Sequence, residues 1–113
     1  MASTEWPVPK RRFPDWPKVD TADLETPYRE VWEFTRPLQT ELDTAIRRGW
    51  VSGDTEFVLR VGISEKALHR YLRGETWPSV QSIAVMERAL DTRLWPRRRL
   101  RRPRARPLWR RRD

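Results

Sequence analysis

Residues 54–74 read DTEFVLRVGISEKALHRYLRG and decide how this chain of 113 residues folds. The first eight of them carry apolar side chains at the three- and four-residue steps of a helix. Gly62 follows, and glycine ends helices readily because it adopts the left-handed conformation without strain. Ser64 is a strong N-cap for a second helix over residues 65–73, which Gly74 ends. The stretch therefore predicts two short helices joined by a tight turn.

Two further segments carry apolar residues at helical spacing. Residues 26–49 open with a Thr-Pro pair, and Pro37 in the middle makes them either two helices or one kinked helix. Residues 79–91 begin with a serine N-cap, and the Leu-Trp pair at 94–95 is expected to fold back over the bundle. No segment reads as a strand, so the predicted class is all-α, a small bundle of four to five helices. The side chains predicted to be buried outside residues 54–74 are Val31, Phe34, Leu38, Leu42, Ala45, Ile46, Val80, Ile83, Met86, Ala89 and Leu90.

The flanks differ from the middle in composition. Residues 1–25 alternate Trp, Pro and charge, and because proline removes a backbone donor we expect an extended segment with little regular structure. Residues 97–113 hold ten Arg and one Asp, a net charge of +9, whereas residues 1–96 hold fourteen basic and fifteen acidic residues, a net charge of −1. The chain thus divides into an N-terminal segment (1–25), a helical domain (26–96) and an Arg-rich tail (97–113) that we expect to be disordered.

Composition also argues against several classes of protein. The chain has no Cys, which excludes disulfides and thiolate metal sites and is usual in a reducing cytoplasm. Its N-terminus has no apolar signal region, and no apolar run approaches the roughly 20 residues of a membrane-spanning helix. One His, no Gly-rich phosphate loop and no evident pair of carboxylates argue against an enzyme. We expect a cytoplasmic protein with no cofactor, metal, membrane partner or small-molecule substrate.

A short helix, a turn containing glycine and a second capped helix make up a helix-turn-helix. The sequence from Phe57 to Leu94 resembles the helix-turn-helix family of phage repressors, Cro proteins and xenobiotic-response-element (XRE) regulators. The resemblance covers residues 42–94, and it implies a DNA-binding transcriptional regulator, nucleoid-associated, whose second helix (64–73) enters the major groove of double-stranded DNA. The residues that carry the resemblance are Val61-Gly62-Ile63-Ser64, Leu68, Arg73-Gly74, Pro78-Ser79, Ile83 and Ala89-Leu90.

The outward side chains of the second helix are the candidate DNA contacts. A recognition helix buries one face and presents long polar side chains to base edges on the other. By resemblance, the base-reading positions are Glu65, Lys66 and Arg70. Lys66 and Arg70 are donors suited to guanine O6 and N7, and Glu65 is an acceptor for a cytosine amino group. Arg70 is the strongest candidate, while a lone His69 fits a solvated residue better than a base contact. The full set of candidate DNA-binding residues is Ser64, Glu65, Lys66, His69, Arg70, Arg73 and Thr55.

Three residues depart from the family pattern. Asp54 stands where the family often has an amide or hydroxyl that holds a phosphate, so Thr55 or a neighbour must take that role, or the contact is absent. Val58 replaces a small residue and is expected to widen the packing between the two helices. Leu72 replaces a polar residue and is expected to pack against a partner subunit or the N-terminal segment.

The Arg-rich tail has two interpretations. A dense basic block binds phosphates through counterion release, without regard to sequence, and leaves specificity to the recognition helix. The alternative is a solubilising extension under little constraint. On the first interpretation, the phosphate contacts of the tail are Arg97, Arg98, Arg99, Arg101 and Arg102.

The tryptophans leave a second question open. Trp32, Trp50, Trp77 and Trp95 lie in or beside predicted helices and are expected at the core or its edge. Trp6 and Trp16 lie outside any period, and they fit a wrap around the body and an anchor for a partner equally well.

Three functions therefore compete. The first is a sequence-specific regulator, acting as a homodimer or cooperatively, since one recognition helix reads only a few base pairs. The second is a non-specific nucleic-acid-binding protein dominated by the tail. The third is a protein-interaction module such as an antitoxin.

Overall fold

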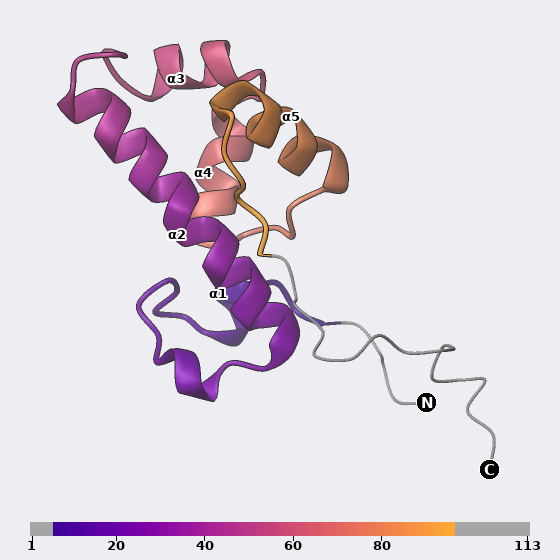
Figure 1. Cartoon of the computed structure of the whole chain (residues 1–113). Coiled ribbons are helices and arrows are strands. Elements are labelled where there is room, and N and C mark those ends of the chain that lie inside the picture. Colours follow the sequence, from indigo (N-terminus) through magenta and orange to yellow (C-terminus); the bar gives the residue numbers. More distant parts are fainter. Residues whose placement is uncertain (1–5, 97–113) are drawn as a thin grey trace.

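The computed structural model of the chain describes residues 6–96, and every regular element in that range is helical. The predicted all-α class, a small bundle with a helix-turn-helix at its centre, is confirmed (Figure 1). In chain order the elements are α1 (Pro9–Arg12), the 3-10 turn η1 (Thr21–Asp23), α2 (Thr26–Arg47), α3 (Asp54–Val61), α4 (Glu65–Arg73) and α5 (Val80–Leu90).

The longest element, α2, runs the length of the described body (Figure 1). The sequence left open whether Pro37 divides this segment, and the structure shows one continuous helix. Pro37 lacks the N–H that a helical residue donates to the carbonyl four positions earlier. Packing compensates for that loss, because Phe34 and Leu38 on either side of Pro37 are fully buried. One helix thereby serves both halves of the molecule.

The main hydrophobic cluster lies where α3, α4 and α5 meet the C-terminal part of α2. Burial of each large apolar side chain in such a cluster is worth roughly 1.5–3 kcal/mol relative to exposure. The predictions for Val80 and Ile46 are wrong, since they are 83 % and 38 % exposed, and Ala89 is exposed as well. Val80 is the first residue of α5, before the part of the helix that packs on the cluster. Within α5, Met86 is the one fully buried residue. The buried members are Phe34, Leu38, Leu42, Ala45, Val51, Phe57, Val58, Val61, Leu68, Tyr71, Met86 and Leu94.

The N-terminal segment packs around the other end of α2. It was expected to have little regular structure, but it contains α1 and η1 and forms a second cluster of Trp16, Leu24, Tyr28 and Val31. Trp16 is 3 % exposed, so the core-capping role holds for this residue. Trp6 stays half-exposed, with its ring edge-on to Tyr28 at a centroid distance of 5.7 Å.

The chain folds back after α5, as predicted. Asp91 ends the helix in the left-handed conformation (φ 50°), and Leu94 is buried in the main cluster. Glu87 holds this return, because its Oε2 accepts the backbone N–H groups of Leu94 (2.7 Å) and Trp95 (2.9 Å).

Of the four tryptophans expected at the core or its edge, three lie there and one is exposed. Trp32, Trp77 and Trp95 are half-buried and pack against the second cluster. The prediction for Trp50 is wrong, since this ring is 59 % exposed and its neighbour is the Arg48 guanidinium, 5.6 Å from the ring centroid.

Candidate nucleic-acid interface

The turn between α3 and α4 is built by the residues that predicted it. Gly62 is left-handed (φ 97°), and its N–H donates to the Val58 carbonyl at 2.8 Å. The Ser64 hydroxyl caps α4 by accepting the Ala67 N–H at 3.0 Å. Gly74 closes α4, again left-handed (φ 71°). Both helices have the predicted bounds.

The apolar face of α4 packs onto α2 and α3. Leu68 is fully buried, and Tyr71 lies edge-on to Phe34 with ring centroids 6.1 Å apart. Val58 of α3 is buried in the same cluster. Leu72 is half-buried and packs against the main cluster, and its expected contact with a partner subunit or the N-terminal segment stays a prediction. α4 is therefore held firmly from behind.

The opposite face of α4 presents its cations to solvent. Lys66, Arg70 and Arg73 are all exposed, and none of them forms a side-chain hydrogen bond or ion pair within residues 6–96. They line a shallow hollow of about 450 Å³ together with Glu65, His69 and Glu75. Lys66 and Arg70 are four residues apart and share one face of the helix. These two side chains are free to reach a partner.

Two side-chain bonds tie the edge of this face to the start of α3. The Thr55 hydroxyl donates to Glu65 Oε1 at 2.9 Å, and His69 Nε2 lies 2.8 Å from Asp54 Oδ2. His69 is half-buried, so it is neither the solvated residue that the sequence favoured nor a free base contact. The structure thus brings Thr55, Glu65 and His69 together as a brace between the two helices. Each of the three side chains has one hydrogen-bonding atom engaged within the protein.

Glu56 fixes the entry to α3. The Ser52 N–H donates to its Oε1 at 2.8 Å, and Arg60 pairs with its Oε2 at 3.0 Å. The backbone hydrogen bond from Ser52, and then the Arg60 charge, hold the pKa of the Glu56 carboxyl below its ordinary value. The carboxylate lies in the first turn, where the helix dipole favours negative charge.

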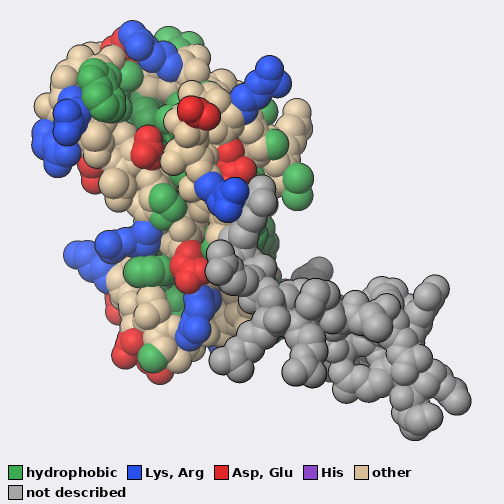
Figure 2. All heavy atoms as spheres, viewed as in Figure 1, with side chains coloured by type: hydrophobic (Ala, Val, Ile, Leu, Met, Phe, Trp, Pro, Cys, Tyr) green, Lys and Arg blue, Asp and Glu red, His purple; other side chains and the backbone are tan. Residues whose placement is uncertain are grey.

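Glu75 is a site residue that the sequence analysis missed. It follows Gly74, and its N–H donates to the Arg70 carbonyl at 2.9 Å, which places it beside the C-terminal end of α4. Its position directly after the helix stop was a signal that could have placed it there. The face away from α4, drawn in Figure 2, shows basic and acidic side chains interspersed. The hollow on α4 likewise pairs three cations with Glu65 and Glu75, so its positive charge is modest.

The predicted phosphate contacts Arg97, Arg98, Arg99, Arg101 and Arg102 lie outside the described residues. Within residues 6–96 there is no cluster of three or more His, Cys, Asp or Glu side chains able to hold a metal ion. In the same range, none of the helices combines the length and the apolar character needed to cross a membrane. Comparisons of the chain with protein-family models, curated proteins and solved structures found no match in any of the three.

Proposed function

We propose that this chain is a sequence-specific DNA-binding protein, a transcriptional regulator of the repressor type, that inserts α4 into the major groove. The observation that carries the proposal is the exposure of Lys66 and Arg70 on a helix that is capped and packed from behind. The resemblance of residues 42–94 to XRE-type regulators supports the same function. The proposal assigns the protein to cytoplasmic, nucleoid DNA and gives it no enzymatic activity.

The dimensions of α4 suit this role. A helix with its side chains is about 10–12 Å across, and the major groove is about 12 Å wide. Lys66 and Arg70 are four residues apart, or about 6 Å along the helix axis. Since base pairs follow each other at about 3.4 Å, the two side chains would reach base pairs about two steps apart. Long, unpaired donors in this position fit guanine O6 and N7.

The other candidates act through position in this proposal. Glu65 Oε1 accepts the Thr55 hydroxyl and His69 Nε2 is bonded to Asp54, while Glu65 Oε2 and His69 Nδ1 are left for other bonds. The two bonds fix the angle at which α4 leaves α3. Base reading in this proposal falls first on the unpaired donors Lys66 and Arg70, with Arg73 near the groove edge.

Selection of bound sequences from random duplexes at about 150 mM salt, where non-specific binding is weak, tests the proposal. The wild-type chain is expected to select a preferred site. Arg70→Ala is expected to relax the preference at one base position by about 1–3 kcal/mol, or roughly 5- to 150-fold. Arg47→Ala, on the exposed face of α2, is the matched control and should leave the preference intact. The absence of any preferred site, or a uniform loss of affinity in Arg70→Ala, would refute base reading by this face.

Deletion of residues 97–113 separates the regulator from a non-specific binder. A regulator keeps its preferred site without the tail and loses affinity and salt sensitivity. A protein dominated by the tail loses all discrimination between sequences.

One observation on α5 bears on how the proposed regulator assembles. A pocket of about 430 Å³ lies between α5 and the returning chain, lined by apolar Val80, Ile83 and Trp95 among others. We infer that this face pairs two copies of the chain, which would give the regulator two half-sites about 34 Å apart. Sedimentation of wild type and of Val80→Asp tests it, since a dimer that persists in the variant would exclude this face.

A further inference from the structure

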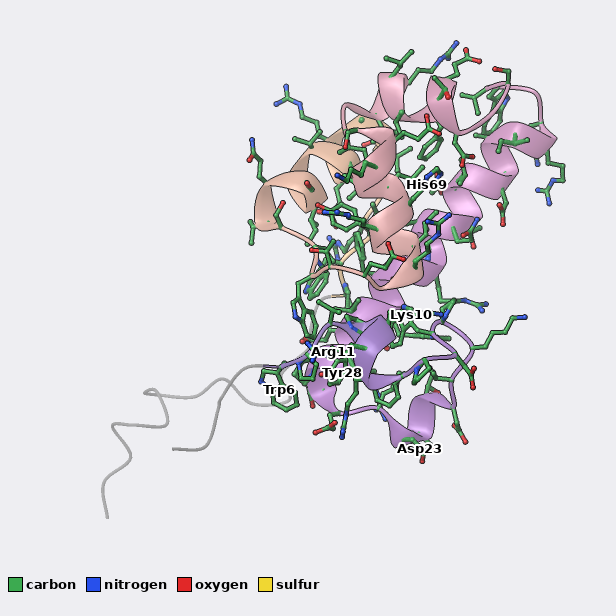
Figure 3. All side chains as sticks on the ribbon, turned by 180° about the vertical axis from the view of Figure 1, so that it is seen from behind. Trp6, Lys10, Arg11, Asp23, Tyr28 and His69 are labelled. Atoms are coloured by element: carbon green, nitrogen blue, oxygen red, sulfur yellow. The ribbon has the colours of Figure 1, made fainter. Side chains whose placement is uncertain are left out.

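The short basic helix α1 is fixed to the C-terminal end of α4. The Lys10 N–H donates to the Gly74 carbonyl at 2.8 Å, directly beyond the last residue of α4. Figures 1 and 3 place α1 and α4 on the same side of α2, one after the other along its length. The sequence gives no hint of this neighbourhood, because Lys10 and Gly74 are far apart in the chain.

The junction is closely packed on both sides. A Cβ on Gly74 would lie 2.5 Å from Trp16 Cδ1 and 3.0 Å from Pro9 Cβ, so both side chains rest directly on the glycine. Ahead of α1 the chain is held again, because the Tyr28 hydroxyl donates to the Pro7 carbonyl at 2.7 Å. α1 is therefore positioned relative to α4 without help from a ligand.

The cations of α1 differ in their engagement. Arg12 pairs with Glu25 at 3.1 Å. Lys10 and Arg11 are exposed and have no side-chain hydrogen bond or ion pair within the described residues, and Figure 3 shows both on α1 below the end of α4. The backbone bond from Lys10 to Gly74 places these unpaired cations next to the end of α4, which Arg73 occupies.

We propose that α1 is a phosphate clamp, in which Lys10 and Arg11 contact the DNA backbone at the edge of the groove that α4 enters. This inference rests on the proposed function. The proposed function puts Arg73, the last residue of α4, near the groove edge, so cations held just past that residue would meet the flanking phosphates. Because the Gly74 junction already holds the α1 backbone in place, DNA binding would cost little conformational entropy in α1.

The test measures the affinity of the full chain for its selected site between 50 and 200 mM salt. The slope of log K against log salt is about −0.9 per phosphate contact. Lys10→Gln/Arg11→Gln is expected to make the slope shallower by about 1.8, so that its loss of affinity over this range is about 12-fold smaller than in wild type. The control variant Arg36→Gln/Arg47→Gln removes the same amount of charge from α2, where the two exposed arginines lie three helical turns apart on one face. It is expected to leave the slope unchanged.

A competition ratio between the selected site and a scrambled duplex is measured on the same proteins. The ratio is expected to stay within twofold of wild type in both double variants, because backbone contacts carry no sequence information. Equal slopes for the two double variants, with the ratio retained, would overturn the clamp while leaving the proposed function standing. A ratio of one in wild type would overturn the proposed function itself. Lys10→Arg/Arg11→Lys keeps the charge and is expected to restore the slope, and failure to do so would also count against the clamp.

Discussion

Replacing Gly74 by Ala tests whether the N-terminal segment and α4 form one unit. Gly74 is buried and left-handed (φ 71°), so a methyl group there meets two separate obstacles. The first is backbone strain, about 1–2 kcal/mol for a residue with a Cβ in this conformation. The second is the Trp16 ring, whose Cδ1 and Nε1 would lie 2.5 and 2.8 Å from the new atom.

The second contribution can be isolated with Gly49→Ala. Gly49 has almost the same conformation (φ 73°), but nothing lies within 4 Å of its would-be Cβ. This variant therefore reports the strain alone. Displacement of Trp16 is expected to add about 1–3 kcal/mol in Gly74→Ala, the usual effect of overpacking. Complete loss of Trp16 packing sets the ceiling, at about 3–5 kcal/mol.

Urea unfolding followed by far-UV circular dichroism measures both free energies of unfolding. Gly74→Ala is expected to be less stable than Gly49→Ala by at least 1 kcal/mol. Its DNA affinity should also show the same shallow dependence on salt as Lys10→Gln/Arg11→Gln, because α1 loses its contact with Gly74. If the two glycine variants unfold within about 0.5 kcal/mol of each other, the packing of the N-terminal segment on α4 is refuted, since that is the spread of ordinary surface changes.

Three further predictions concern single side chains. Ser64→Ala removes the N-cap of α4 and is expected to lower the free energy of unfolding by about 1 kcal/mol, with Ser64→Gly much milder; equal effects would deny the cap. Burial raises the pKa of Tyr28 above 10.0, so its neutral phenol stabilises the fold below pH 10 and that contribution is lost as pH rises through the folded-state pKa. Tyr28→Phe is expected to lose about 1 kcal/mol at pH 7, with the bond to Pro7, and to flatten the decline of stability above pH 10 in urea titrations; an unaltered decline would contradict this. Glu75→Gln is expected to tighten DNA binding about two- to threefold at low salt, for a charge about 7 Å from a phosphate, as measured by fluorescence anisotropy; weaker binding would place Glu75 away from the DNA.

The sequence predicted the elements whose ends are set locally. Ser64 and Ser79 cap helices through their own hydroxyls, and Gly62 ends one through its own backbone, so the signal and the structure lie within a few residues of each other. The outward direction of Lys66 and Arg70 follows from helical period in the same way. Local rules were sufficient for these features.

Features that depend on tertiary contacts were not predicted. Pro37 is tolerated within α2 because packing on both sides outweighs one missing hydrogen bond. Trp16 lies outside any period, and its ring is buried by Gly74 and by the second cluster, which come from other parts of the chain. The bond between His69 and Asp54 joins two helices, and its formation depends on the angle at which they cross, which no spacing within one helix encodes. Whether the exposed face binds DNA stays a prediction.

Gly74 connects these two kinds of feature. As the last cap of α4 it was predicted from the sequence, and as the platform for Trp16 and Lys10 it was not. Both roles need the same missing side chain, since a Cβ would strain the cap and occupy the space of the ring. The end of α4 and the start of the basic α1 are thus held by one residue, and a change there is expected to move the proposed base reading and the proposed phosphate contact together. Separate effects would mean that α1 moves independently of α4.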